Sequence, residues 1–108
     1  MDYKKLQIMK YIISENRLNE IMTEYLNGWA ESRTVYRNDP FIVIEEPNHE
    51  VEDWDVIMEY DIIDGRLYVS KRITKHLMDL FGKNEIDVRV FVAEWFGKKF
   101  NVDIEFVE

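Results

Sequence analysis

The sequence of 108 residues contains no cysteine, and this absence excludes several kinds of chemistry. Without cysteine there is no disulfide framework, no thiolate ligand for a metal ion and no cysteine nucleophile. The chain has only four glycines, each isolated, so it carries neither a phosphate-binding loop nor a dinucleotide-binding fingerprint. None of its serines lies in a Gly-x-Ser-x-Gly motif. We therefore expect a protein that is not an enzyme and that needs no cofactor.

Long apolar runs are absent as well. No stretch approaches the roughly 20 apolar residues of a membrane-spanning helix. The N-terminal segment also lacks the uninterrupted apolar region and the small-residue cleavage site of a secretory signal. We therefore expect a cytoplasmic protein that makes no contact with a membrane.

Apolar side chains are nevertheless plentiful, since 46% of the residues are hydrophobic and 14% are aromatic. This composition is sufficient for a sizeable core. The length is that of one domain, so residues 1–108 are expected to fold around a single core.

Negative charge is concentrated in one part of the sequence. Residues 45–64 contain nine acidic residues and no lysine or arginine. The other 88 residues hold 13 acidic and 14 basic residues, so the formal charge of −8 belongs to this acidic window. A local excess of negative charge repels nucleic acid and attracts basic surfaces. The sequence therefore predicts a basic protein partner and no direct binding to nucleic acid.

Within the acidic window, residues 53–62 alternate between acidic and apolar side chains. Successive side chains of a β-strand point to opposite faces, so this alternation predicts a strand with one face in water. Ile57 is the single exception on the acidic side. The acids expected on the solvent face are Asp53, Asp55, Glu59 and Asp61.

The dipeptide Asp64-Gly65 follows this strand and is typical of a tight type I′ hairpin turn. A two-residue turn there places Tyr60 opposite Val69 and Ile62 opposite Leu67. The apolar side chains of both strands then share one face, as a consistent register requires. Folding alone therefore explains most of the alternation.

Three helices are predicted from apolar periodicity and capping residues. The first covers residues 15–30 and begins at an N-cap, Ser14, after a short strand at residues 10–13. The second begins at Ser70 and ends at Gly82, where a left-handed conformation is expected. The third begins at Asn84 and runs to about residue 100, although residues 86–92 also alternate like a strand.

The remaining segments predict connections and strands. Residues 31–39 form a polar connection that closes in an Asn-Asp-Pro turn, and residues 41–44 form a buried strand. Residues 45–53 form an exposed loop, and residues 102–106 form a last strand. The predicted fold class is α+β, with an antiparallel sheet of four or five strands that about three helices cover on one face. If the last strand lies at an exposed edge, it favours a homodimer.

The acidic window offers two functional hypotheses. The first is a surface for a basic protein, in which Trp54 supplies an aromatic anchor beside Asp53, Asp55, Glu59 and Asp61. The alternative is a divalent-metal site or a metal-dependent activity centred on His49, Asp53 and Asp55, because Ca²⁺ and Mg²⁺ prefer hard oxygen ligands. Against the alternative, EF-hand spacing is absent. Moreover, carboxylates at alternate strand positions lie about 6.5 to 7 Å apart, too far to share one ion.

Two stretches carry a resemblance to a known group of proteins. Residues 10–27, KYIISENRLNEIMTEYLN, combine a short apolar run with Ser-Glu-x-x-Leu and an amphipathic helix. Residues 92–107, VAEWFGKKFNVDIEFV, lead from an aromatic helix into a strand. In both stretches the chain resembles small uncharacterised proteins encoded by tailed phages, marine ones in particular. The resemblance implies a viral accessory protein of unknown role, and it identifies no catalytic residue. Small acidic phage proteins that inhibit host factors exist as a class, which favours the interaction hypothesis.

Overall fold

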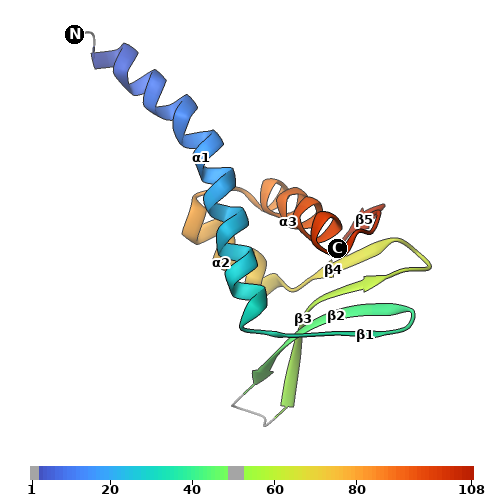
Figure 1. The fold of residues 1–108 in the computed structure, drawn as a ribbon. Coiled ribbons are helices and arrows are strands. Elements are labelled where there is room, and N and C mark those ends of the chain that lie inside the picture. Colours follow the sequence, from blue (N-terminus) through green and yellow to red (C-terminus); the bar gives the residue numbers. More distant parts are fainter. Residues whose placement is uncertain (1–2, 49–52) are drawn as a thin grey trace.

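The fold is known from a computed structural model, which describes residues 3–48 and 53–108 (Figure 1). Its elements in chain order are α1 (Tyr3–Glu31), β1 (Thr34–Asn38), β2 (Phe41–Asn48), β3 (Asp53–Asp61), β4 (Arg66–Val69), α2 (Lys71–Phe81), α3 (Glu85–Phe100) and β5 (Phe106–Val107). The strands form one sheet in the order β1-β2-β3-β4-β5. Neighbouring strands are antiparallel except for β4 and β5, which are parallel. The predicted α+β class is confirmed, with a mixed sheet in place of a wholly antiparallel one.

The second and third helices begin and end where the sequence predicts. The Ser70 hydroxyl accepts a hydrogen bond from the Ile73 N–H, and Gly82 ends α2 with φ of 63°. The Asn84 side chain accepts from the Asp87 N–H, which starts α3. Because α3 runs from there to Phe100, the helical interpretation of residues 86–92 is the correct one.

The first helix is much longer than predicted. It begins at Tyr3, so the expected strand at residues 10–13 and the N-cap at Ser14 are wrong. Lysine, leucine, glutamine and methionine in this segment favour a helix. A helix also satisfies its own backbone groups, whereas an isolated strand does not.

The core lies between the three helices and one face of the sheet. Leu26 of α1, Leu77 of α2 and Phe96 of α3 are fully buried. The sheet contributes buried residues to the same core, among them Ile44, Met58, Tyr60, Leu67 and Val69. A second link joins α1 to α3, since Trp95 Nε1 donates a hydrogen bond to Asn27 Oδ1 at 2.9 Å.

The segment expected to be a polar connection is wrong in part, because Thr34–Asn38 forms the edge strand β1. Its Thr-Val-Tyr sequence consists of residues that favour strands, and it pairs with β2 so that Tyr36 lies opposite Val43. The strand β2 extends to Asn48, so most of the expected loop at residues 45–53 is sheet. Residues 49–52 lie outside the part of the chain that the structure describes.

The β3–β4 hairpin has a longer loop than predicted. Tyr60 lies opposite Leu67 and not opposite Val69, and four residues, 62–65, separate the strands. The cause is Asp61, whose Oδ1 accepts hydrogen bonds from the backbone N–H groups of residues 63 and 64. Gly65, with φ of 68°, closes the loop by donating to the Asp61 carbonyl at 2.8 Å. A shift of two residues preserves the faces of the strand, so Tyr60 is buried as predicted.

The last strand is shorter than predicted, with only Phe106 and Val107 in the sheet. The Gly65 carbonyl accepts hydrogen bonds from the N–H groups of Glu105 and Phe106, which joins this strand to the preceding loop. Beside it, the Tyr60 hydroxyl donates to the Asp103 carbonyl at 2.6 Å. The pKa of Tyr60 is raised above 10.0, mainly by burial and further by the charges of nearby acids.

Candidate functional site

An irregularity at Ile57 divides the acidic window between the two faces of the sheet. Ile44 pairs with Met58, but the next residue, Glu45, pairs with Val56, so Ile57 is an extra residue in β3. Ile57 and Met58 are adjacent in sequence and both are buried, 3% and 0% exposed. A β-bulge of this kind reverses the alternation of side chains along the strand.

The bulge puts on different faces of the sheet the acidic residues that the alternation predicted on one face. Paired residues of neighbouring strands point to the same face. Asp55 pairs with Glu46, whose side chain contacts the helix side, whereas Glu59 pairs with Val43 on the opposite face. The expectation that Asp53, Asp55, Glu59 and Asp61 share one face is therefore wrong.

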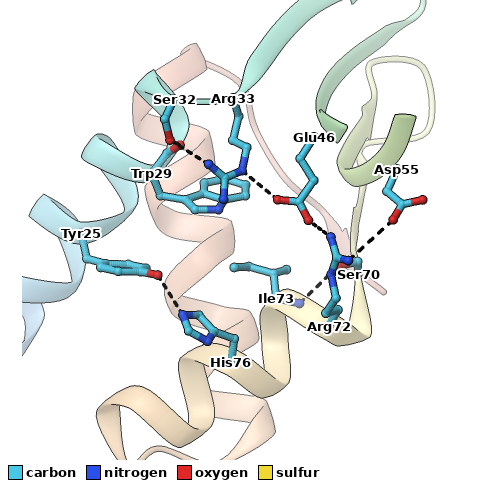
Figure 2. Close-up of polar contacts among 10 residues, drawn as sticks. All are labelled: Tyr25, Trp29, Ser32, Arg33, Glu46, Asp55, Ser70, Arg72, Ile73 and His76. Carbon is cyan, nitrogen blue, oxygen red and sulfur yellow. Dashed lines mark hydrogen bonds and ion pairs between the residues drawn. The ribbon is translucent and has the colours of Figure 1, made fainter. Parts of the chain in front are cut away.

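On the helix side, Glu46 lies between two arginines (Figure 2). Arg33 Nε donates to Glu46 Oε2 at 2.8 Å, and Arg72 pairs with the other carboxylate oxygen of Glu46. Arg72 also lies 3.7 Å from the Asp55 carboxylate. The Arg33 guanidinium is 5.3 Å from the centre of the Trp29 ring. These ion pairs fasten β2 and β3 to the turn after α1 and to the start of α2, so this pair of acids serves the fold.

A pocket of about 260 Å³ lies beside this cluster. In it the Tyr25 hydroxyl and His76 Nε2 are hydrogen bonded at 2.9 Å, as Figure 2 shows. Its lining is Tyr25, Trp29, Arg33, Glu46, Ile57, Arg72, Ile73 and His76. The lining contains no serine, cysteine or lysine, and both arginines already pair with carboxylates. The pocket therefore places one phenol hydroxyl next to an imidazole and contains no serine, cysteine or lysine nucleophile.

No group of three or more histidine, aspartate or glutamate side chains suited to a metal ion occurs among the residues that the structure describes. His49 lies outside those residues, as does the side chain of Asp53. The third residue of the metal hypothesis, Asp55, faces Arg72. A metal site at these residues stays a prediction. Among the described helices, none combines the length and the apolarity that crossing a membrane requires.

The face of the sheet away from the helices carries a row of tyrosine and glutamate side chains. Tyr36 of β1, Glu59 of β3 and Tyr68 of β4 lie on one cross-strand row, with Val43 between Tyr36 and Glu59. Tyr36 and Tyr68 are 39% and 42% exposed. We call the surface formed by Tyr36, Glu45, Glu59, Tyr68 and Phe106 the open sheet face.

The electrostatics of this face depend on two glutamates. The Tyr36 hydroxyl donates to Glu45 Oε1 at 2.6 Å, and this hydrogen bond is the main cause of the raised pKa of Tyr36. Desolvation and the charges of Glu45 and Glu59 raise it further. The Glu59 side chain makes no hydrogen bond or ion pair with another described residue, although its backbone pairs with β2 and β4. Its carboxylate therefore remains available to a cation from outside the chain.

The edge of the open sheet face at β5 carries an aromatic ring next to a cation. Phe106 is 55% exposed, and the Arg66 guanidinium lies 5.6 Å from the centre of its ring. Arg66 also pairs with Glu108 at 3.2 Å, so its charge is balanced locally. The net effect along this face is negative charge between aromatic side chains.

The predicted partner-binding residues are thus distributed over two faces and a turn. Glu59 lies on the open sheet face, Asp61 holds the hairpin loop, and Asp55 faces Arg72. The side chains of Asp53 and Trp54 lie outside the described residues.

Sequence reasoning missed Tyr36, Glu45 and Tyr68. One signal was present, because the alternation of Leu67 and Val69 already put Tyr68 on the face opposite the core.

Comparisons with protein-family models, with curated proteins and with solved structures found no match. The resemblance to phage proteins therefore stays a prediction. The candidate site depends on the geometry of this chain alone.

Proposed function

We propose that this protein is a non-catalytic interaction protein whose open sheet face binds a basic partner protein. The observation that carries the proposal is the row of Tyr36, Glu59 and Tyr68. In this row a carboxylate with no partner among the described residues lies between two half-exposed tyrosine rings.

The chemistry of this row suits arginine and lysine side chains. A carboxylate accepts short charge-assisted hydrogen bonds from a guanidinium. Tyrosine rings attract the same cation through their faces, and tyrosine is enriched among the residues that dominate binding energy. Glu45, held by the Tyr36 hydroxyl, adds a second charge at the β1 side.

The resemblance to phage accessory proteins supports the same role. An accessory protein of this kind would act in the cytoplasm on a basic surface of a host protein. The acidic face argues against nucleic acid as the partner, since phosphates would be repelled.

The test is a titration of the ¹⁵N-labelled chain with an arginine-rich peptide, followed by the amide shifts. We expect the largest shifts in β1, β3 and β4 around Tyr36, Glu59 and Tyr68. Glu59→Gln should weaken binding about tenfold, because a hydrogen bond to a charged group contributes about 1.5 kcal/mol.

The matched control is Asp79→Asn on α2, which removes the same charge from an exposed helix position. It should leave the affinity within about twofold of the natural chain, because exposed charges more than a Debye length apart, about 10 Å, are largely screened. Equal affinities of the two variants, or shifts confined to the helices, would refute the proposal.

A further inference from the structure

The first helix extends well beyond the rest of the molecule, as Figure 1 shows. Its 29 residues correspond to a length of about 44 Å at 1.5 Å per residue. The molecule measures 58 × 33 × 21 Å along its principal axes. Among the described side chains of α1, burial in the core begins only at Met22, and Arg17, Glu20 and Ile21 are exposed. The first half of α1 therefore projects away from the core of its own chain.

A groove of about 750 Å³ runs between α1 and α3. Its apolar part includes Met22, Val90 and Phe91, and Val90 is 51% exposed. Its charged lining consists of four acids and two lysines: Glu20, Glu24, Asp87, Glu94, Lys83 and Lys98. A groove with an apolar floor and an excess of negative charge suits an amphipathic basic helix.

The projecting half of α1 has these properties in its sequence. Residues 3–14 contain three lysines, Lys4, Lys5 and Lys10, and no acid. Ile8, Ile12, Asn19 and Thr23 follow one another along the helix at separations of four, seven and four residues. The last two of them line the groove. In a helix such separations fall along one side. By this spacing, the positions of Ile8 and Ile12 fall on the same side of α1 as the two groove residues.

We infer that two copies of the chain form a two-fold dimer, in which the first half of each α1 lies in the α1–α3 groove of the other copy. The two-fold axis is perpendicular to the α1 helices, so the helices run antiparallel. The first half of one α1 then lies against the second half of the other. The interface is self-complementary, as two-fold symmetry requires. The lysines of residues 3–14 meet the acids of the groove twice. The inference does not use the open sheet face, so either proposal can fail without the other.

The experiment is sedimentation equilibrium of the full chain over a wide range of concentration. We expect a monomer–dimer equilibrium for the natural sequence. Glu20→Lys with Glu24→Lys should raise the dimer dissociation constant by at least about tenfold, because two symmetric sets of surface ion pairs become repulsive. Lys5→Glu with Lys10→Glu should do the same. Combining all four substitutions should restore most of the affinity, because attraction returns with reversed signs.

The matched control reverses two exposed charges away from the groove, Glu31→Lys with Asp79→Lys, and should leave the dimer intact. Circular dichroism melting of every variant separates loss of dimer from loss of fold. A monomer at all concentrations, a dimer insensitive to the groove substitutions, or no rescue by the combined variant would each overturn the inference.

The absence of cysteine allows a second, geometric measurement. A mixture of Ile8→Cys and Thr23→Cys chains should form a mixed disulfide on mild oxidation, since the antiparallel arrangement brings these positions together. The pair Ile8→Cys and Asp79→Cys is the control and should not cross-link. Equal cross-linking of both mixtures would contradict the antiparallel arrangement.

Discussion

Replacing Glu46 by glutamine tests the division of the acidic window most directly. The substitution keeps the shape of the side chain and removes its charge. Arg33 and Glu46 have side chains only 26% and 20% exposed, and their hydrogen bond is 2.8 Å long. The Arg33 guanidinium would lose its only carboxylate partner among the described residues while remaining largely shielded from water.

The expected loss follows from this geometry. A hydrogen bond between charged groups contributes about 1.5 to 3 kcal/mol when it is well buried. Partial exposure reduces this value, and the pair with Arg72, whose side chain is 61% exposed, adds only the few tenths of an exposed ion pair. We expect Glu46→Gln to reduce the free energy of unfolding by about 1 to 2 kcal/mol. For a domain of this size that loss lowers Tm by about 5 to 10 °C.

The matched control is the neighbouring residue. Glu45 lies on the opposite face, where its partner is the exposed Tyr36, so Glu45→Gln should change stability by no more than about 0.5 kcal/mol. Urea unfolding followed by circular dichroism measures both variants. A double-mutant cycle of Glu46→Gln with Arg33→Gln should give a coupling energy of about 1 kcal/mol. Equal losses for the two glutamates, or no coupling to Arg33, would refute the assignment of faces.

Three further predictions concern the hairpin and the metal hypothesis. Because burial raises the pKa of Tyr60, the folded state keeps this proton where the unfolded state loses it, so stability should fall as pH rises above about 10. Tyr60→Phe should flatten that alkaline decline in pH-dependent urea unfolding, and an unchanged slope would contradict the cause given. Gly65→Ala should destabilise the folded protein by about 1 to 2 kcal/mol, because φ at this position is +68°. Gly28→Ala in α1, where open space surrounds the glycine, should stabilise it by about 0.5 to 1 kcal/mol. Urea unfolding that gives the same sign for both substitutions would contradict this prediction. Adding Ca²⁺, Mg²⁺ or Mn²⁺ should leave Tm unchanged, since a bound ion must raise it, and a rise that Asp55→Asn abolishes would revive the metal hypothesis.

Local signals in the sequence were sufficient to predict the helices whose ends are capped by residues of the same segment. The caps at Ser70 and Asn84 and the left-handed Gly82 define α2 and α3 through contacts within a few residues. The buried Tyr60 followed from alternation along β3, which holds on that side of the bulge.

Features that depend on distant partners could not be read in the same way. The strand β1 exists because β2 returns beside it. Its Thr-Val-Tyr sequence suits a strand, but all five of its residues are exposed, so no alternation of apolar and polar side chains predicted it. The extra residue at Ile57 leaves no mark in the sequence except one apolar side chain at an acidic position, and that exception alone did not predict a bulge. The hairpin loop was misjudged because Asp61 was assigned to solvent, whereas its carboxylate binds the loop backbone.

Because of the inserted residue at Ile57, substitutions at the two ends of β3 have different consequences. Toward the start of β3, a substitution at Asp55 removes a carboxylate that lies beside Arg72, so it changes the stability of the fold. Beyond the bulge, a substitution at Glu59 leaves the interior untouched and alters only what the molecule presents to its surroundings. Substitutions beyond the bulge can therefore change the exposed face while the buried side of the sheet stays the same, and under the proposed function they would alter the choice of partner.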